Sequence, residues 1–93
     1  MFKRWYLSRM QTEIDQRGTQ LAEEKARTAG ASETLRAGHQ ELIAAAEGKG
    51  RDLSLRLDAL RKSGKENYAE LKANVEIARE GFGDAVRSAH RFA

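Results

Sequence analysis

Residues 68–92 read YAELKANVEIAREGFGDAVRSAHRF, and this stretch decides the fold. Its apolar residues recur at alternating spacings of three and four: Tyr68, Leu71, Val75, Ala78, Phe82, Ala85, Ala89 and Phe92. On an α-helix this rhythm places them along one narrow side, as in the interface of a coiled coil or helical bundle. One helix cannot cover such a stripe by itself, so the sequence predicts that at least one other helix packs against it.

The composition favours a thin helical protein. The chain has 93 residues, enough for one small domain over residues 1–93, and it lacks proline and cysteine. Without cysteine, disulfides and thiolate chemistry are excluded, and without proline long helices are unobstructed. One third of the residues are charged and the mean hydropathy is −0.73, which argues against a thick core. The regular spacing of the apolar residues argues against a disordered chain.

The charge pattern and the absence of targeting signals set expectations for location. The formal net charge is +3, with acids and bases interspersed as on a solvated helical surface. This dilute excess makes nucleic acid an unlikely partner. The longest apolar run, residues 42–46, is too short to cross a membrane, and the N-terminus lacks the apolar core of a signal peptide. We therefore expect a soluble, cytoplasmic protein.

The first half of the chain predicts one long helix. Residues 3–47 are mostly strong helix formers, and one column at a seven-residue spacing holds Leu7, Ile14, Leu21, Thr28, Leu35 and Leu42. The segment at 28–32, TAGAS, has the composition of a turn that ends in a helix cap. However, the leucine column continues in phase across it. We therefore predict a continuous helix from about 3 to 47, weakened by about 1 kcal/mol at its internal glycine.

The midpoint of the chain predicts a turn. Gly48 and Gly50 together cost a continuous helix about 2 kcal/mol, and Asp52 is suited to cap a following helix. We therefore predict a turn at about 48–51 and a second helix over about 52–91, in which the irregular apolar spacing before residue 71 is a local stutter. The predicted fold is all-α: a long, coiled-coil-like antiparallel hairpin, completed as a four-helix bundle by dimerisation. A single long helix in a coiled coil and a three-helix arrangement are the alternatives.

The predicted hairpin implies specific contacts between its two helices. Folding at Lys49 sets large residues opposite small ones, as interdigitated packing requires. The expected pairs are Tyr68 with Gly30 or Ala31, Leu60 with Gly38, and Phe82 with Gly18. The predicted interaction stripe consists of Leu7, Ile14, Leu21, Leu35, Leu42, Leu53, Leu57, Leu60, Tyr68, Leu71, Val75, Phe82 and Phe92.

The N-terminus mixes aromatic and basic residues. The residues of this patch are Phe2, Lys3, Arg4, Trp5, Tyr6 and Arg9. Such a mixture suits the interface of an anionic membrane or a partner protein. In the structural interpretation, the hairpin brings these aromatics beside Phe82, Val86 and Phe92, where together they close the open end of the bundle.

Catalytic and cofactor chemistry have little basis in this sequence. His39 and His90 have no partner at a metal-ligand spacing, and the basic group at 56–65 is interpreted as a solvated helix face. We therefore expect no enzyme activity, no cofactor and no small-molecule substrate. The first hypothesis is a scaffold or accessory protein that associates with itself, as a homodimer, or with another protein through its apolar stripes. The alternative is a peripheral membrane-binding protein, and nucleic-acid binding is a weaker possibility.

Overall fold

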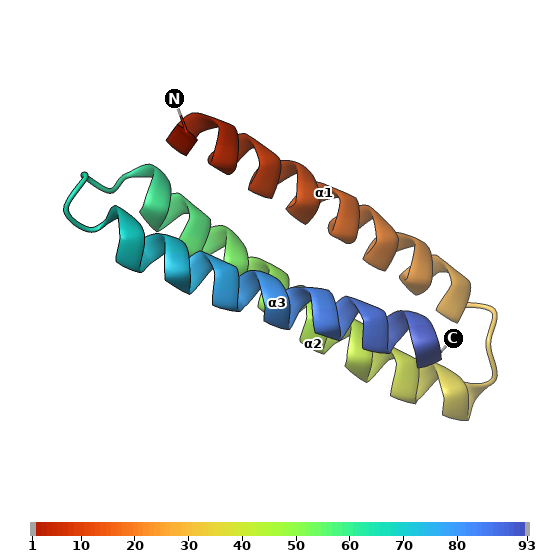
Figure 1. Ribbon diagram of the computed structural model, residues 1–93. Helices are drawn as coiled ribbons and strands as arrows, with labels where there is room; N and C mark the ends of the chain where they lie inside the picture. The colour runs from red at the N-terminus through yellow and green to blue at the C-terminus, as the bar shows by residue number, and fades with distance from the viewer. Residues whose placement is uncertain (1, 93) are drawn as a thin grey trace.

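The computed structural model describes residues 2–92 as three helices that run up, down and up in an elongated bundle (Figure 1). Helix α1 spans Phe2–Thr28, α2 spans Glu33–Arg61 and α3 spans Tyr68–Phe92. The bundle measures 51 × 17 × 17 Å. The start of α1 lies at the same end as the α2–α3 connection, and the C-terminus lies at the other end. The prediction of an all-α fold of packed helices is confirmed, whereas the two-helix division is wrong.

The predicted helix over 3–47 ends at Thr28. The chain turns through residues 29–32, and Ser32 has the extended conformation of a helix cap, with φ −61° and ψ 155°. Glu33 then starts α2 with an acidic first turn, which suits the positive end of the helix dipole. The leucine column misled the prediction because its phase across the turn is accidental. Leu35, the first leucine beyond the turn, is 57% exposed.

The glycines at 48 and 50 lie inside α2 and do not form the predicted turn. A Cβ atom at position 50 would lie 3.0 Å from two ring carbons of Phe82, so Gly50 permits a close approach between α2 and α3. The side chains of Ala46 and Leu53 on either side are fully buried and hold this segment of the helix in the core. The alternative of a single long helix is also wrong, because the chain reverses direction twice.

The predicted helix over 52–91 is interrupted at residues 62–67. The main chain and the hydroxyl of Ser63 both donate hydrogen bonds to the Leu60 carbonyl, at 3.1 and 2.7 Å, and close the end of α2. Helix α3 begins after this connection, with the Leu71 amide bonded to the Asn67 carbonyl at 3.0 Å. The irregular apolar spacing in this part of the sequence therefore results from a turn between two helices and is not a stutter within one helix.

The core is assembled within one chain. Its buried apolar residues are Tyr6, Met10, Leu21, Ile43, Ala46, Leu53, Leu57, Leu60, Val75, Phe82, Val86 and Ala89. In the predicted stripe, Leu7, Ile14, Leu42, Tyr68 and Leu71 pack partly buried against this core, while Leu35 and Phe92 are exposed.

The predicted pairs of large and small residues are wrong, because the helices pair in a different register. The Phe82 ring packs on Gly50, and the Phe92 ring packs on Gly38. At Gly18 there is open space, with nothing within 4 Å of a Cβ atom.

Polar contacts attach the first half of α1 to α3. The Arg79 guanidinium donates two hydrogen bonds to the Glu13 carboxylate, at 2.5 and 3.1 Å. This hydrogen bonding, with the positive charge of Arg79, lowers the pKa of Glu13. The Tyr6 hydroxyl donates to the carboxylate of Glu76. Burial of Tyr6, followed by this bond, raises the pKa of the phenol above its ordinary value, so it remains a donor at neutral pH.

Replacing each midpoint glycine by alanine should have opposite effects on stability. Gly48→Ala should stabilise the protein by up to about 1 kcal/mol through helix propensity, because the new methyl group meets only the flexible Arg51 side chain at 3.6 Å. Gly50→Ala should destabilise the protein, because the new methyl group overlaps the Phe82 ring. The overlap costs about 1–3 kcal/mol, from which the gain in helix propensity of up to about 1 kcal/mol is subtracted. Urea unfolding of both variants measures the difference. Equal stabilisation by the two substitutions would contradict the close approach of α2 and α3.

The Glu13–Arg79 contact should stabilise the fold only while the carboxylate is ionised. Because the pKa of Glu13 is lowered in the folded state, its contribution is complete above the ordinary value of 4.5 and is lost as the pH falls below it. A double-mutant cycle with Glu13→Gln and Arg79→Gln should give a coupling energy of about 1 kcal/mol near neutral pH, as for a well-oriented surface pair. The coupling energy should vanish near pH 2. A coupling energy that does not change with pH would show that the contact is not ionic.

Candidate functional site

Two aromatic side chains project into solvent near the start of α1. Phe2 is 88% exposed and Trp5 is 61% exposed, with the Arg9 guanidinium 5.3 Å from the centre of the Trp5 ring. Tyr6, which the sequence grouped with them, points the other way and is buried. The predicted aromatic plug is wrong, because Phe92 lies at the opposite end of the bundle, stacked on His39 with ring centroids 5.5 Å apart.

The α2–α3 connection folds against this start of α1. The Lys3 ammonium donates to the Ser63 carbonyl at 2.7 Å and lies 5.9 Å from the centre of the Tyr68 ring. Arg61 shares a shallow hollow with Lys3 and Arg4, and Lys65 shares another with Phe2 and Lys3. The fold therefore joins two basic groups that lie far apart in the sequence. We call this surface the basic end; its residues are Phe2, Lys3, Arg4, Trp5, Arg9, Arg61, Lys62 and Lys65.

The charge excess of the whole chain is located at the basic end. Residues 2–10 and 58–70 carry six basic and three acidic side chains, a difference equal to the net charge of +3 of the full sequence. The remaining segments are therefore balanced. Of the three acids, Asp58 is already paired with Lys62 at 2.9 Å and with Arg61 at 3.4 Å. Hydrogen bonding to Lys62 lowers the pKa of Asp58, so this carboxylate remains ionised and paired at neutral pH.

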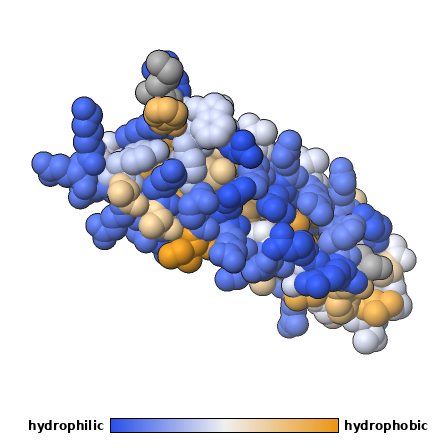
Figure 2. Space-filling model, viewed as in Figure 1, coloured by the Kyte–Doolittle hydropathy of each residue, from blue (hydrophilic) through white to orange (hydrophobic). Residues whose placement is uncertain are grey.

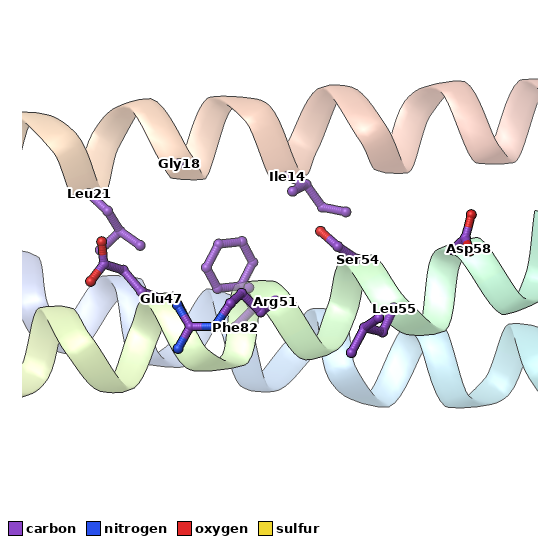
Figure 3. Close-up of a pocket in the computed structure, with 10 residues that line it drawn as sticks. Ile14, Gly18, Leu21, Glu47, Arg51, Ser54, Leu55, Asp58 and Phe82 are labelled. Atoms are coloured by element: carbon purple, nitrogen blue, oxygen red, sulfur yellow. The ribbon is translucent and has the colours of Figure 1, made fainter.

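A groove runs between α1 and α2 in the middle of the bundle. Among residues 11–20 of α1 no side chain is buried, so this part of the helix lies loosely on its neighbours. The groove has a volume of about 620 Å³, with Phe82 at its floor, Ile14 and Gly18 on one wall and Ser54 on the other (Figure 3). On the outer side of α2, Leu55 lies at its edge and is 71% exposed. On the face drawn in Figure 2, apolar residues form separate patches on a mainly hydrophilic surface.

The end of the bundle opposite the basic end contains a buried polar network. Glu24 of α1, 1% exposed, accepts a hydrogen bond from His90 of α3 at 2.8 Å. His39 of α2 is hydrogen-bonded through Nδ1 to the Thr28 hydroxyl and through Nε2 to the Ala89 carbonyl at 2.9 Å. The second oxygen of Glu24 lies 3.4 Å from His39 Nε2. Side chains of all three helices therefore meet at this network and fix their register.

Thr28, His39 and Glu24 bring a hydroxyl, an imidazole and a carboxylate together, the groups of a nucleophilic site. Each of these residues is at most 4% exposed. Moreover, the Thr28 hydroxyl donates to the Glu24 carbonyl of its own helix at 2.9 Å. A substrate has no access to this hydroxyl, so we interpret the network as structural. Within residues 2–92 no group of three or more histidine, aspartate or glutamate side chains is placed to hold a metal ion.

No protein-family model, no curated protein and no solved structure matches this chain. Its function is therefore inferred from its residues and their arrangement. Among residues 2–92, none of the helices is both long and apolar enough to cross a bilayer.

The sequence analysis identified the exposed aromatics but missed their basic neighbours around the α2–α3 connection and the buried network. The predicted hairpin separated Arg61, at the end of α2, and the loop residues Lys62 and Lys65 from the N-terminus, which left no reason to combine them. The sequence spacing could have indicated the network. Glu24 and Thr28 lie one helical turn apart on the same helix face as Leu21, which is a core position.

Removing the Glu24 carboxylate should destabilise the whole bundle. Glu24→Ala removes the buried carboxylate to which His90 and Arg27 are hydrogen-bonded, and the loss of a buried hydrogen-bonding group of this kind costs about 1–3 kcal/mol. Glu23→Ala, at an exposed position one residue away, should change stability by no more than about 0.5 kcal/mol. Thermal unfolding of both variants by circular dichroism makes the comparison. Equal stabilities would show that the network does not hold the helices together.

Proposed function

We propose that this protein is a non-enzymatic helical module that binds the surface of anionic membranes through its basic end. The observation that carries the proposal is the position of Phe2 and Trp5, 88% and 61% exposed, beside the basic side chains of α1 and the α2–α3 connection. Aromatic rings are favoured at the depth of the lipid headgroups. Lysine and arginine near an anionic leaflet each contribute about 1 kcal/mol of attraction.

The spatial distribution of charge favours a membrane over a nucleic acid. A protein that binds a duplex along its length needs a row of basic residues on a long face. In this chain, the segments outside the basic end carry equal numbers of basic and acidic side chains. The excess charge and the exposed aromatics are instead together at one tip of a bundle 51 Å long. A tip of this kind suits contact with a flat membrane surface, because the rings of Phe2 and Trp5, one helical turn apart, can both enter the lipid headgroup region.

Self-association through the heptad stripes remains a prediction with weaker support. We predicted self-association because an apolar stripe that no helix of its own chain covers needs a partner chain to bury it. In this bundle most of their residues are covered by helices of the same chain.

Vesicle binding should depend on both the aromatic residues and the negative charge. Trp5 is the only tryptophan, so its fluorescence reports directly on the basic end. Adding vesicles of phosphatidylserine and phosphatidylcholine should shift its emission to the blue and sediment the protein. Pure phosphatidylcholine should not, and high salt should reverse the binding. Phe2→Ala should weaken binding about tenfold, which corresponds to a loss of about 1.4 kcal/mol of buried apolar surface.

Ile77→Ala is the matched control, because it removes another large exposed apolar residue, 71% exposed, from α3, outside the basic end. This variant should bind vesicles as the unmodified protein does. An emission spectrum that does not change on anionic vesicles at low salt would refute the proposal. Salt-sensitive binding to a DNA duplex that Phe2→Ala leaves unchanged would point to a nucleic-acid partner instead.

A further inference from the structure

The groove between α1 and α2 has the size and the lining of a site for a small apolar ligand. Its volume of about 620 Å³ lies within the range of about 300–1,000 Å³ that is usual for such sites. The Phe82 ring forms its floor, and Ile14 and Leu21 point from α1 into it (Figure 3). Apolar surface of a ligand that enters the groove leaves water and gains contact with these side chains, which stabilises the complex.

Gly18 keeps the middle of this groove open. It lies inside α1, where a glycine costs about 1 kcal/mol relative to alanine. At Gly50 the close contact with the Phe82 ring accounts for the same cost, but nothing lies within 4 Å of a Cβ atom placed at Gly18. No packing contact in the described part of the chain therefore requires a glycine here. Gly18 lines the groove between Leu21 and Ile14, and glycine is the residue that lets a ligand come close to a helix backbone.

The charges at the rim of the groove favour an anionic ligand group. Glu47 and Asp58 line the groove, but each already has a basic partner. The Glu47 carboxylate lies 3.6 Å from the Lys25 ammonium, and the Asp58 carboxylate lies 2.9 Å from the Lys62 ammonium. Arg51 also lines the groove, and it forms no salt bridge among the described residues. Its guanidinium is therefore the charge of the lining that is free to pair with a ligand.

The position of Arg51 sets how such a ligand lies. Its Nη2 atom lies 3.6 Å from a Cβ atom placed at Gly48, toward one end of the groove. From Gly48, α2 runs about 15 Å to Asp58 at the other end, at 1.5 Å per residue. Arginine binds a carboxylate through two parallel hydrogen bonds. A flexible aliphatic chain with one terminal carboxylate matches this arrangement of a long apolar floor and a single free guanidinium.

We propose that the α1–α2 groove binds a free long-chain fatty acid. The aliphatic chain lies over the Phe82 ring in the space that Gly18 leaves open, and the carboxylate pairs with Arg51. None of the residues of the basic end lines the groove. The fatty acid therefore binds in the absence of a membrane, and this proposal does not depend on the proposed function.

Filling the groove should block the aliphatic chain. Amide NMR spectra, recorded during titration with laurate below its micelle concentration and without vesicles, measure the dissociation constant and locate the site. The largest shifts should fall on the residues that line the groove. Gly18→Leu should weaken binding at least about tenfold, which corresponds to the lost burial of two methylene groups. Thr19→Leu is the matched control, because it adds the same side chain at the next, exposed position of α1, which does not line the groove.

Removing the guanidinium should affect only the charged ligand. Arg51→Gln should weaken the binding of laurate about fivefold, as for an exposed ion pair, and should leave the binding of dodecanol unchanged. Arg56→Gln is the control for this change. Arg56 pairs with Asp52 at 2.9 Å and does not line the groove, so this variant should bind both ligands as the unmodified protein does.

Circular dichroism should show every variant, with and without laurate, to be as helical as the unmodified protein. Laurate that shifts no amide of the groove up to its micelle concentration would overturn the proposal. Equal effects of Gly18→Leu and Thr19→Leu would overturn it as well. Tighter binding of dodecyltrimethylammonium than of laurate would show that Glu47 and Asp58 select a cation, which would refute the pairing of a carboxylate with Arg51.

Discussion

The contact between Phe82 and Gly50 is the constraint on which the rest of the bundle depends. Because a glycine occupies this position of α2, the aromatic ring of α3 lies directly against the helix backbone. The two helices approach closely there and form a pair with Leu53, Leu57, Val75 and Val86 buried around the contact. Their pairing uses most of the apolar surface of both helices. Helix α1 covers what remains, and its middle part lies loosely over a groove whose floor is the same Phe82 ring.

This constraint explains how much of the fold the sequence predicts. The apolar periodicity of residues 68–92 correctly indicates a helix with one buried side, and Val75, Phe82 and Ala89 are indeed buried. The positions of the turns do not follow from periodicity. Gly50 marks a close helix contact, whereas Gly30 and Gly64 lie in connections between helices. All three have the same local cost in a helix of about 1 kcal/mol. Only the partner across the interface, a residue more than thirty positions away, distinguishes their roles.

The candidate site also has one part that the sequence predicts and another that depends on the three-dimensional fold. The aromatic and basic character of residues 2–9 is visible in the sequence, because it depends on local composition. Their union with Arg61, Lys62 and Lys65 depends on the second turn, which closes α2 at Leu60 and brings Ser63 within reach of Lys3. The buried network of Glu24 and His39 also depends on the topology. Glu24 and His39 lie on either side of the first turn, and a single helix over 3–47 would have kept them about 22 Å apart along its axis, at 1.5 Å per residue.

The distribution of exposed apolar side chains separates the surfaces that need a partner from those that do not. Once α1, α2 and α3 have buried their stripes, the large apolar residues that stay exposed among residues 2–92 are Phe2, Trp5, Leu35, Leu55, Ile77 and Phe92. Single exposed apolar residues are ordinary on protein surfaces and require no explanation. Phe2 and Trp5 differ because they share one tip with the net charge of the chain. This coincidence of exposed rings and net charge is what supports the proposed membrane contact at the tip.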